Sequence, residues 1–144
     1  MYDVIAENEF LIDHMIENQI KPVFKNCRVH VSNMCGDICL DIGLISNVLH
    51  TNGYAANPDP LKLTLLIKVS KDKYGINMYE LFVDTYQLIL KNSETFNGLL
   101  CCISNTTYVD LLQSVYNWMR AVSVNVFQHK DKLLIRDDIK HLYV

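Results

Sequence analysis

A histidine and two cysteines lie near one another in the sequence and are the side chains best suited to chemistry. His30, Cys35 and Cys39 could together supply metal ligands, or a thiol nucleophile beside a base. No paired C-x-x-C motif accompanies them, and no histidine or acid pair has a recognisable catalytic spacing. A cysteine on an apolar stripe is usually an inert core residue. We therefore predict no enzyme activity, no metal and no cofactor, with a thiol or zinc site as the alternative.

Composition narrows the class of protein. The chain has 144 residues, half of them apolar, which predicts a single globular domain over 1–144. The net charge is −3 without any cluster of Lys and Arg, so nucleic-acid binding is not expected. The sequence contains no run of about twenty apolar residues, so no transmembrane segment is expected. The five cysteines are odd in number and irregularly spaced, which is typical of reduced thiols in the cytosol.

Apolar residues recur every three or four positions along most of the chain, which predicts helices. Val29-His30-Val31 alternates as a strand would, so the start of the second segment is ambiguous. In the first half of the chain we expect a helix over 5–20, ended by Pro22, two helices between Val31 and Leu49, broken near Gly43, and one from Pro60 to about Tyr74, capped by Asp59. In the second half we expect a helix from about Met78 to Lys91 and a short buried one over 96–103. A long helix capped by Thr107 should then run from about Tyr108 to Phe127, followed by a short last one within 131–143.

The helix expected after Tyr74 would begin at a sharp corner. Gly75 suits a left-handed residue that closes one helix, and Asn77 suits the cap of the next. Glu80 stands three residues after Asn77, as in a capping box. The fold predicted from these elements is all-α, with seven to eight helices around a central hydrophobic helix.

Three short segments give this arrangement a resemblance to the Bcl-2 family, and especially to its compact virus-encoded members. Met34-Cys35-Gly36-Asp37-Ile38 resembles the core of a BH3 segment, with Cys35, Gly36 and Asp37 at its centre. Gly75-Ile76-Asn77 resembles the start of the BH1 signature. The sequence separation between Asp37 and Asn77 is close to the separation of the BH3 and BH1 motifs in the family. Tyr116-Asn117-Trp118-Met119-Arg120 resembles the helix after the central one. An alternative BH1 register is Phe96-Asn97-Gly98-Leu99.

The sequence also departs from the family pattern. Met78-Tyr79-Glu80 stands where the family has Trp-Gly-Arg, and Ser32 stands in place of the key Leu of BH3. In the family that Arg pairs with the Asp of a bound BH3 helix. Glu80 has the opposite charge and would repel this Asp, which predicts a narrow or weakened set of partners.

The resemblance implies a Bcl-2-like domain that inhibits host apoptosis by holding a pro-apoptotic BH3 helix, such as that of Bim, Bak or Bax, in a hydrophobic groove. It places the protein in the host cytoplasm, or peripherally at mitochondria. The alternative is a closed groove and interference with NF-κB signalling; a homodimer, with Cys101-Cys102 at an interface or in the core, is a further alternative. The groove residues would be Ile38, Ile42, Leu66, Val69, Met78, Leu81, Phe82, Asn77 and Glu80.

Overall fold

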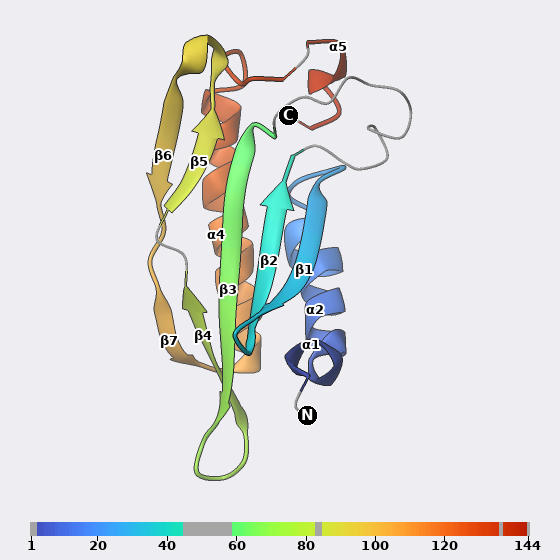
Figure 1. Cartoon of the computed structure of the whole chain (residues 1–144), viewed down its shortest axis with the longest axis vertical. Helices are drawn as coiled ribbons and strands as arrows, with labels where there is room; N and C mark the ends of the chain where they lie inside the picture. Colours follow the sequence, from blue (N-terminus) through green and yellow to red (C-terminus); the bar gives the residue numbers. More distant parts are fainter. Residues whose placement is uncertain (1–2, 45–58, 83–84, 136, 144) are drawn as a thin grey trace.

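The middle of the chain forms an antiparallel sheet, and helices lie on one of its faces (Figure 1). The computed structural model describes residues 3–44, 59–82, 85–135 and 137–143. The predicted all-α bundle of seven to eight helices is wrong, because this sheet holds seven strands. We call the sheet face that packs against the helices the inner face and the opposite one the outer face.

The strands run antiparallel to their neighbours. They are β1 (Arg28–Met34), β2 (Asp37–Gly43), β3 (Leu61–Lys71), β4 (Asn77–Phe82), β5 (Thr85–Ile89), β6 (Thr95–Leu99) and β7 (Ile103–Thr106). Their order is β1-β2-β3-β4-β7, while β5 pairs with both β3 and β6. The long strand β3 holds β4 along its C-terminal half and β5 at its N-terminal end. As a result β4 and β5 follow one another along the same side of β3.

Helices occupy both ends of the described chain. The first part contains α1 (Val4–Glu7), α2 (Glu9–Met15) and the π-helical η1 (Ile16–Ile20), and the last part contains α4 (Tyr108–Gln128) and α5 (Asp137–Lys140), with a short 3-10 turn, η2 (Lys91–Ser93), between β5 and β6. Thr107 caps α4 by accepting the Asp110 N–H at 3.3 Å. The helix predicted over 108–127 is confirmed by α4, and the one predicted over 5–20 is present as three consecutive pieces, α1, α2 and η1. None of the helices in the described ranges is both long and apolar enough to cross a membrane.

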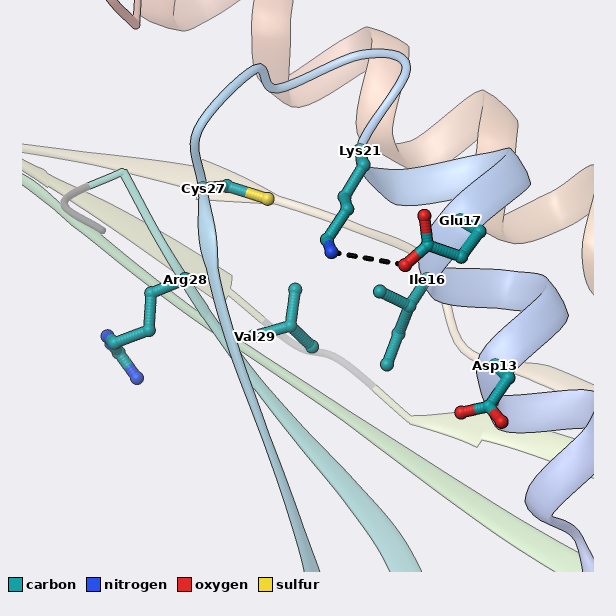
Figure 2. A pocket seen from close by; sticks show the side chains of 7 residues that line it. All are labelled: Asp13, Ile16, Glu17, Lys21, Cys27, Arg28 and Val29. Atoms are coloured by element: carbon teal, nitrogen blue, oxygen red, sulfur yellow. Dashed lines mark hydrogen bonds and ion pairs between the residues drawn. The ribbon is translucent and has the colours of Figure 1, made fainter. Parts of the chain in front are cut away.

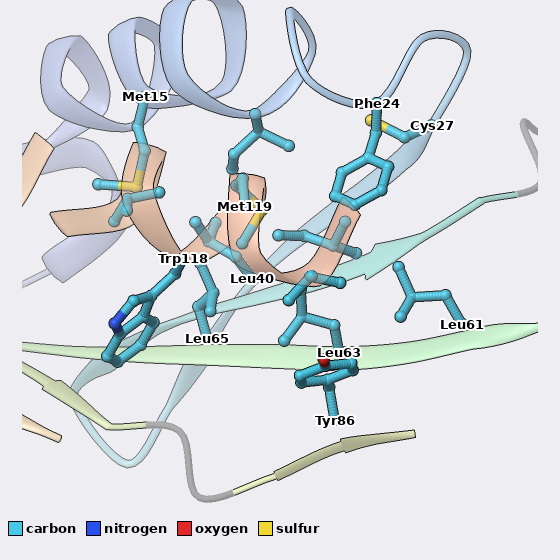
Figure 3. Packing of buried hydrophobic residues seen from close by; sticks show 14 of the residues in the cluster. Met15, Phe24, Cys27, Leu40, Leu61, Leu63, Leu65, Tyr86, Trp118 and Met119 are labelled. Atoms are coloured by element: carbon cyan, nitrogen blue, oxygen red, sulfur yellow. The ribbon is translucent and has the colours of Figure 1, made fainter. Parts of the chain in front are cut away.

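The hydrophobic core lies between the inner face and the helices (Figure 3). Met15 and Phe24 reach it from the N-terminal segment, and Trp118 and Met119 reach it from α4. The sheet contributes alternate residues of its central strands, including Ile38, Leu40, Ile42, Leu61, Leu63, Leu65 and Ile67. The apolar stripe of α4 consists of Leu111, Val115, Trp118, Met119, Val122 and Val126.

The prediction of helices between Val31 and Ile103 is wrong, because the described residues there form strands whose buried positions follow a period of two. In β3 the buried Leu63 and Leu65 flank the exposed Thr64. A spacing of four residues, as between Ile38 and Ile42, satisfies a helix and also an alternating strand, since four is an even number. The chain near Leu49 lies outside the described residues.

Two of the three segments that carried the family resemblance form turns between strands, and the third, Tyr116-Asn117-Trp118-Met119-Arg120, lies within α4. Cys35 and Gly36 join β1 to β2 with positive φ values of 54° and 89°, which is the conformation of a two-residue type I′ hairpin. Gly75 is left-handed as expected, with φ 79°, but it closes the β3–β4 hairpin. Asn77 begins β4 and caps no helix, and Asp37 begins β2. The helices that a BH3 segment and a BH1 segment require are therefore absent at these two positions.

A single carboxylate ties together the ends of three strands. Asp59 Oδ1 accepts the Leu44 N–H at 3.0 Å and the Leu61 N–H at 3.1 Å. Its Oδ2 accepts a hydrogen bond from Arg28 Nη2 at 3.1 Å. Asp59 was expected to cap a helix, whereas it joins the start of β1 to the end of β2 and the start of β3. Gly43 permits this approach, since a Cβ there would lie 1.7 Å from Asp59 Oδ2.

Replacing Asp59 with Ala should lower the free energy of unfolding by about 2–4 kcal/mol, because partly buried backbone N–H groups and Arg28 lose a charged acceptor. Urea denaturation followed by the fluorescence of the single tryptophan, Trp118, measures this change. Asp41→Ala is the matched control, because its carboxylate accepts a hydrogen bond from Thr64 at an exposed site. Equal losses in the two variants would contradict the role given to Asp59.

Gly43→Ala should also destabilise the protein, because the new methyl group would displace the Asp59 carboxylate. The cost should fall by at least about 1 kcal/mol in an Asp59→Ala background, since the obstructing oxygen is then absent. Urea denaturation of the four proteins of this double-mutant cycle gives the coupling energy. Additive losses would mean that Gly43 is needed for another reason.

Candidate binding surface on the outer face of the sheet

The pleat of the sheet divides the predicted groove residues between its two faces. Ile38, Ile42 and Leu81 are buried in the core on the inner face, and Val69 packs against the same core. Leu66, Met78, Glu80 and Phe82 alternate with inner-face residues and lie on the outer face. Asn77 is exposed at the start of β4. The predicted residues therefore do not line one groove between helices.

A row of four residues, one polar and three apolar, crosses the outer face in register, and its Cys39 is 1% exposed. Ser32 on β1 pairs with Cys39 on β2, which pairs with Leu66 on β3, which pairs with Phe82 on β4. Phe82 is 36% exposed and Leu66 is half-buried. We call the four residues Ser32, Cys39, Leu66 and Phe82 the outer row. Met34, at the end of β1, adds a side chain that is 50% exposed.

Charged residues flank the outer row. Lys62 and Lys68 are exposed on β3, on either side of Leu66 along the strand. Lys68 lies opposite Glu80 of β4 in the register, and His30 lies opposite Asp41. Charges of both signs therefore border an apolar centre. This arrangement suits recognition of an amphipathic partner better than recognition of a uniformly charged polymer.

The thiols on this side of the sheet are poorly suited to chemistry. Burial raises the pKa of Cys39 above its ordinary value, with a hydrogen bond from Ser32 opposing the shift. A thiol with a raised pKa stays protonated near neutral pH, so it is a weak nucleophile. His30 and Cys35 are exposed. Within the described ranges, no group of three or more His, Cys, Asp or Glu residues could hold a metal ion.

A cleft of about 600 Å³ separates α2 and η1 from the start of β1 (Figure 2). Its lining contains Asp13, Ile16, Glu17, Lys21, Cys27, Arg28 and Val29. Lys21 Nζ binds Glu17 Oε1 at 3.1 Å, and Arg28 points away from this pair toward Asp59. Burial raises the pKa of the Cys27 thiol. Lys21 is paired with Glu17 and Arg28 with Asp59, and the thiol with a raised pKa is a weak nucleophile.

The sequence interpretation missed Ser32 and Cys39 as parts of a surface shared with Leu66 and Phe82. A usable signal was present in Leu61-Lys62-Leu63-Thr64-Leu65, where apolar and polar residues alternate strictly. That alternation predicts a strand with one solvated face. No local pattern predicts which residues of other strands stand beside it.

Comparison with protein-family models, curated proteins and solved structures gives no match, so the functional assignment depends on the geometry of this chain itself.

Proposed function

We propose that this protein acts by binding a partner protein on the outer face of its sheet and catalyses no reaction. The observation that carries the proposal is the outer row, whose accessible apolar members Leu66 and Phe82 lie beside charged residues on a face that no described helix covers. The solvated face of an antiparallel sheet is usually polar. Two exposed apolar residues, Phe82 and Met34, are present on this face.

The dimensions of the outer row suit an amphipathic helix laid across the strands. Neighbouring strands are about 4.8 Å apart, and side chains one helical turn apart recur about every 5.4 Å. Anchors on successive turns can therefore meet Leu66 and Phe82, whereas Cys39, 1% exposed, lies beneath the surface between its neighbours. Polar residues beside those anchors would meet Lys68 and Glu80. Lys68 can pair with an acidic side chain of the partner, and Glu80 with a basic one.

A BH3 helix remains the specific candidate for this partner, as the resemblance implied. An Asp on such a helix would meet Lys68 beside Glu80, which reduces the repulsion expected from Glu80 alone. Inhibition of host apoptosis, interference with NF-κB signalling and residence in the host cytoplasm or at mitochondria stay predictions. The helical groove that the resemblance required has no counterpart among the described residues.

The exposed residues of this surface should contribute little to folding. Met34→Lys should change the free energy of unfolding by no more than about 0.5 kcal/mol, because its side chain is already half exposed. The core control Leu81→Ala should cost about 2–5 kcal/mol, because Leu81 is fully buried. Urea denaturation monitored by Trp118 fluorescence compares the two. Similar losses would show that Met34 serves stability, which argues against a binding surface.

Calorimetric titration with synthetic BH3 peptides of Bim, Bak and Bax tests the partner class. A peptide that binds should lose at least about tenfold in affinity, or 1.4 kcal/mol, against Phe82→Lys, because the substitution places a charge in the outer row. Ile76→Lys is the matched control, since Ile76 is an exposed apolar residue in the β3–β4 hairpin. Equal affinities for both variants would remove the outer face as the site, and no binding would remove BH3 helices as the partner.

A further inference from the structure

The strand β6 lies at an open edge of the sheet (Figure 1). It pairs with β5, and no other strand in the described part of the chain pairs with it. The Leu90 N–H donates to Glu94 O at 2.8 Å, and these two residues stand opposite each other where the strands begin to pair. Bonding alternates along an antiparallel pair, so Phe96 and Gly98 bond to β5. The N–H and C=O groups of Thr95, Asn97 and Leu99 consequently point away from the sheet.

This edge has no charged side chain to discourage pairing. From Thr95 through Val109 the sequence contains no Asp, Glu, Lys or Arg. Exposed edges usually carry charges, especially Lys, or a proline that blocks addition of another strand. The opposite edge of the sheet differs, because β1 carries Arg28 and His30 and adjoins α2 and η1 across the cleft. Leu99 on the uncharged edge is 82% exposed.

The edge strand is held rigidly from its inner side. The Tyr86 ring packs on Gly98, where a Cβ would lie 2.0 Å from the ring. The Tyr86 hydroxyl accepts a hydrogen bond from Asn125 of α4. The rings of Phe96 and His129 lie 4.5 Å apart between their centres. A strand fixed in this way presents its outward N–H and C=O groups in a preformed order, which lowers the entropic cost of pairing.

We propose that β6 pairs antiparallel with β6 of a second copy of this chain, joining two sheets into one. Identical strands pair antiparallel about a twofold axis, so one surface serves both partners. The chain carries a net charge of −3, and two copies repel least where they meet at an uncharged edge. Pairing would bond the outward groups of Asn97 and Leu99 and cover the Leu99 side chain.

This dimer would have a definite consequence for the outer face. A twofold axis perpendicular to the sheet keeps the outer faces of both copies on the same side. Two outer rows would then be presented together, so that a partner with two binding segments gains from bivalency. The edge pairing itself does not depend on the proposed function, because it uses the backbone of β6 and not the outer row.

Sedimentation velocity of the full chain, from low micromolar to submillimolar concentration, tests the proposal. We expect a monomer–dimer equilibrium, and Leu99→Lys should raise its Kd at least about tenfold by placing like charges across the twofold axis. Phe10→Lys is the matched control, because Phe10 is a similarly exposed apolar residue on α2. A monomer at every concentration, or a dimer that Leu99→Lys leaves unchanged, would overturn the proposal.

Amide hydrogen exchange by NMR provides a second measurement that needs no substitution. The Asn97 and Leu99 amides should become more protected as concentration rises, whereas the Phe96 and Gly98 amides should be protected at all concentrations by β5. A dimer in which Asn97 and Leu99 exchange at the monomer rate would place the interface elsewhere and overturn the assignment to β6.

Discussion

Burial of one face of the sheet against α4 and the N-terminal helices constrains the rest of this structure. Side chains alternate along a strand, so placing Leu63, Leu65 and Ile67 in the core directs the residues between them to the opposite face. The register between strands then aligns Cys39, Leu66 and Phe82 across that face. The candidate binding surface is thus a geometric consequence of how the core is packed.

The Asp59 carboxylate complements this packing at one end of the sheet. It bonds backbone groups at the end of β2 and the start of β3, and it also binds Arg28 at the start of β1. Such a bridge between strand ends adds to the register that burial of one face of the sheet already specifies. The Gly43 backbone leaves the space that the carboxylate occupies.

The helices that the family resemblance implied at two of its motifs are hairpins for a physical reason. The motifs Cys35-Gly36-Asp37 and Gly75-Ile76-Asn77 contain the residue types that begin and end helices, and these types also make the turns of hairpins. Glycine at positive φ closes the turns at Gly36 and Gly75, as it would close a helix. Short matches of this kind report local backbone conformation and do not distinguish helix ends from hairpins.

The sequence by itself determined the elements whose signals are local. The stripe of α4 and its Thr107 cap, the helical character of residues 5–20 and the left-handed Gly75 could all be predicted, because each depends on neighbours within a few positions. Only the tertiary structure decided that Ile38 and Leu66 belong to opposite faces, that Asp59 joins three strands and that β6 lies at an edge. These features arise from pairing between segments far apart in the chain, where hydrogen bonding and burial select one partner among many that local patterns permit equally.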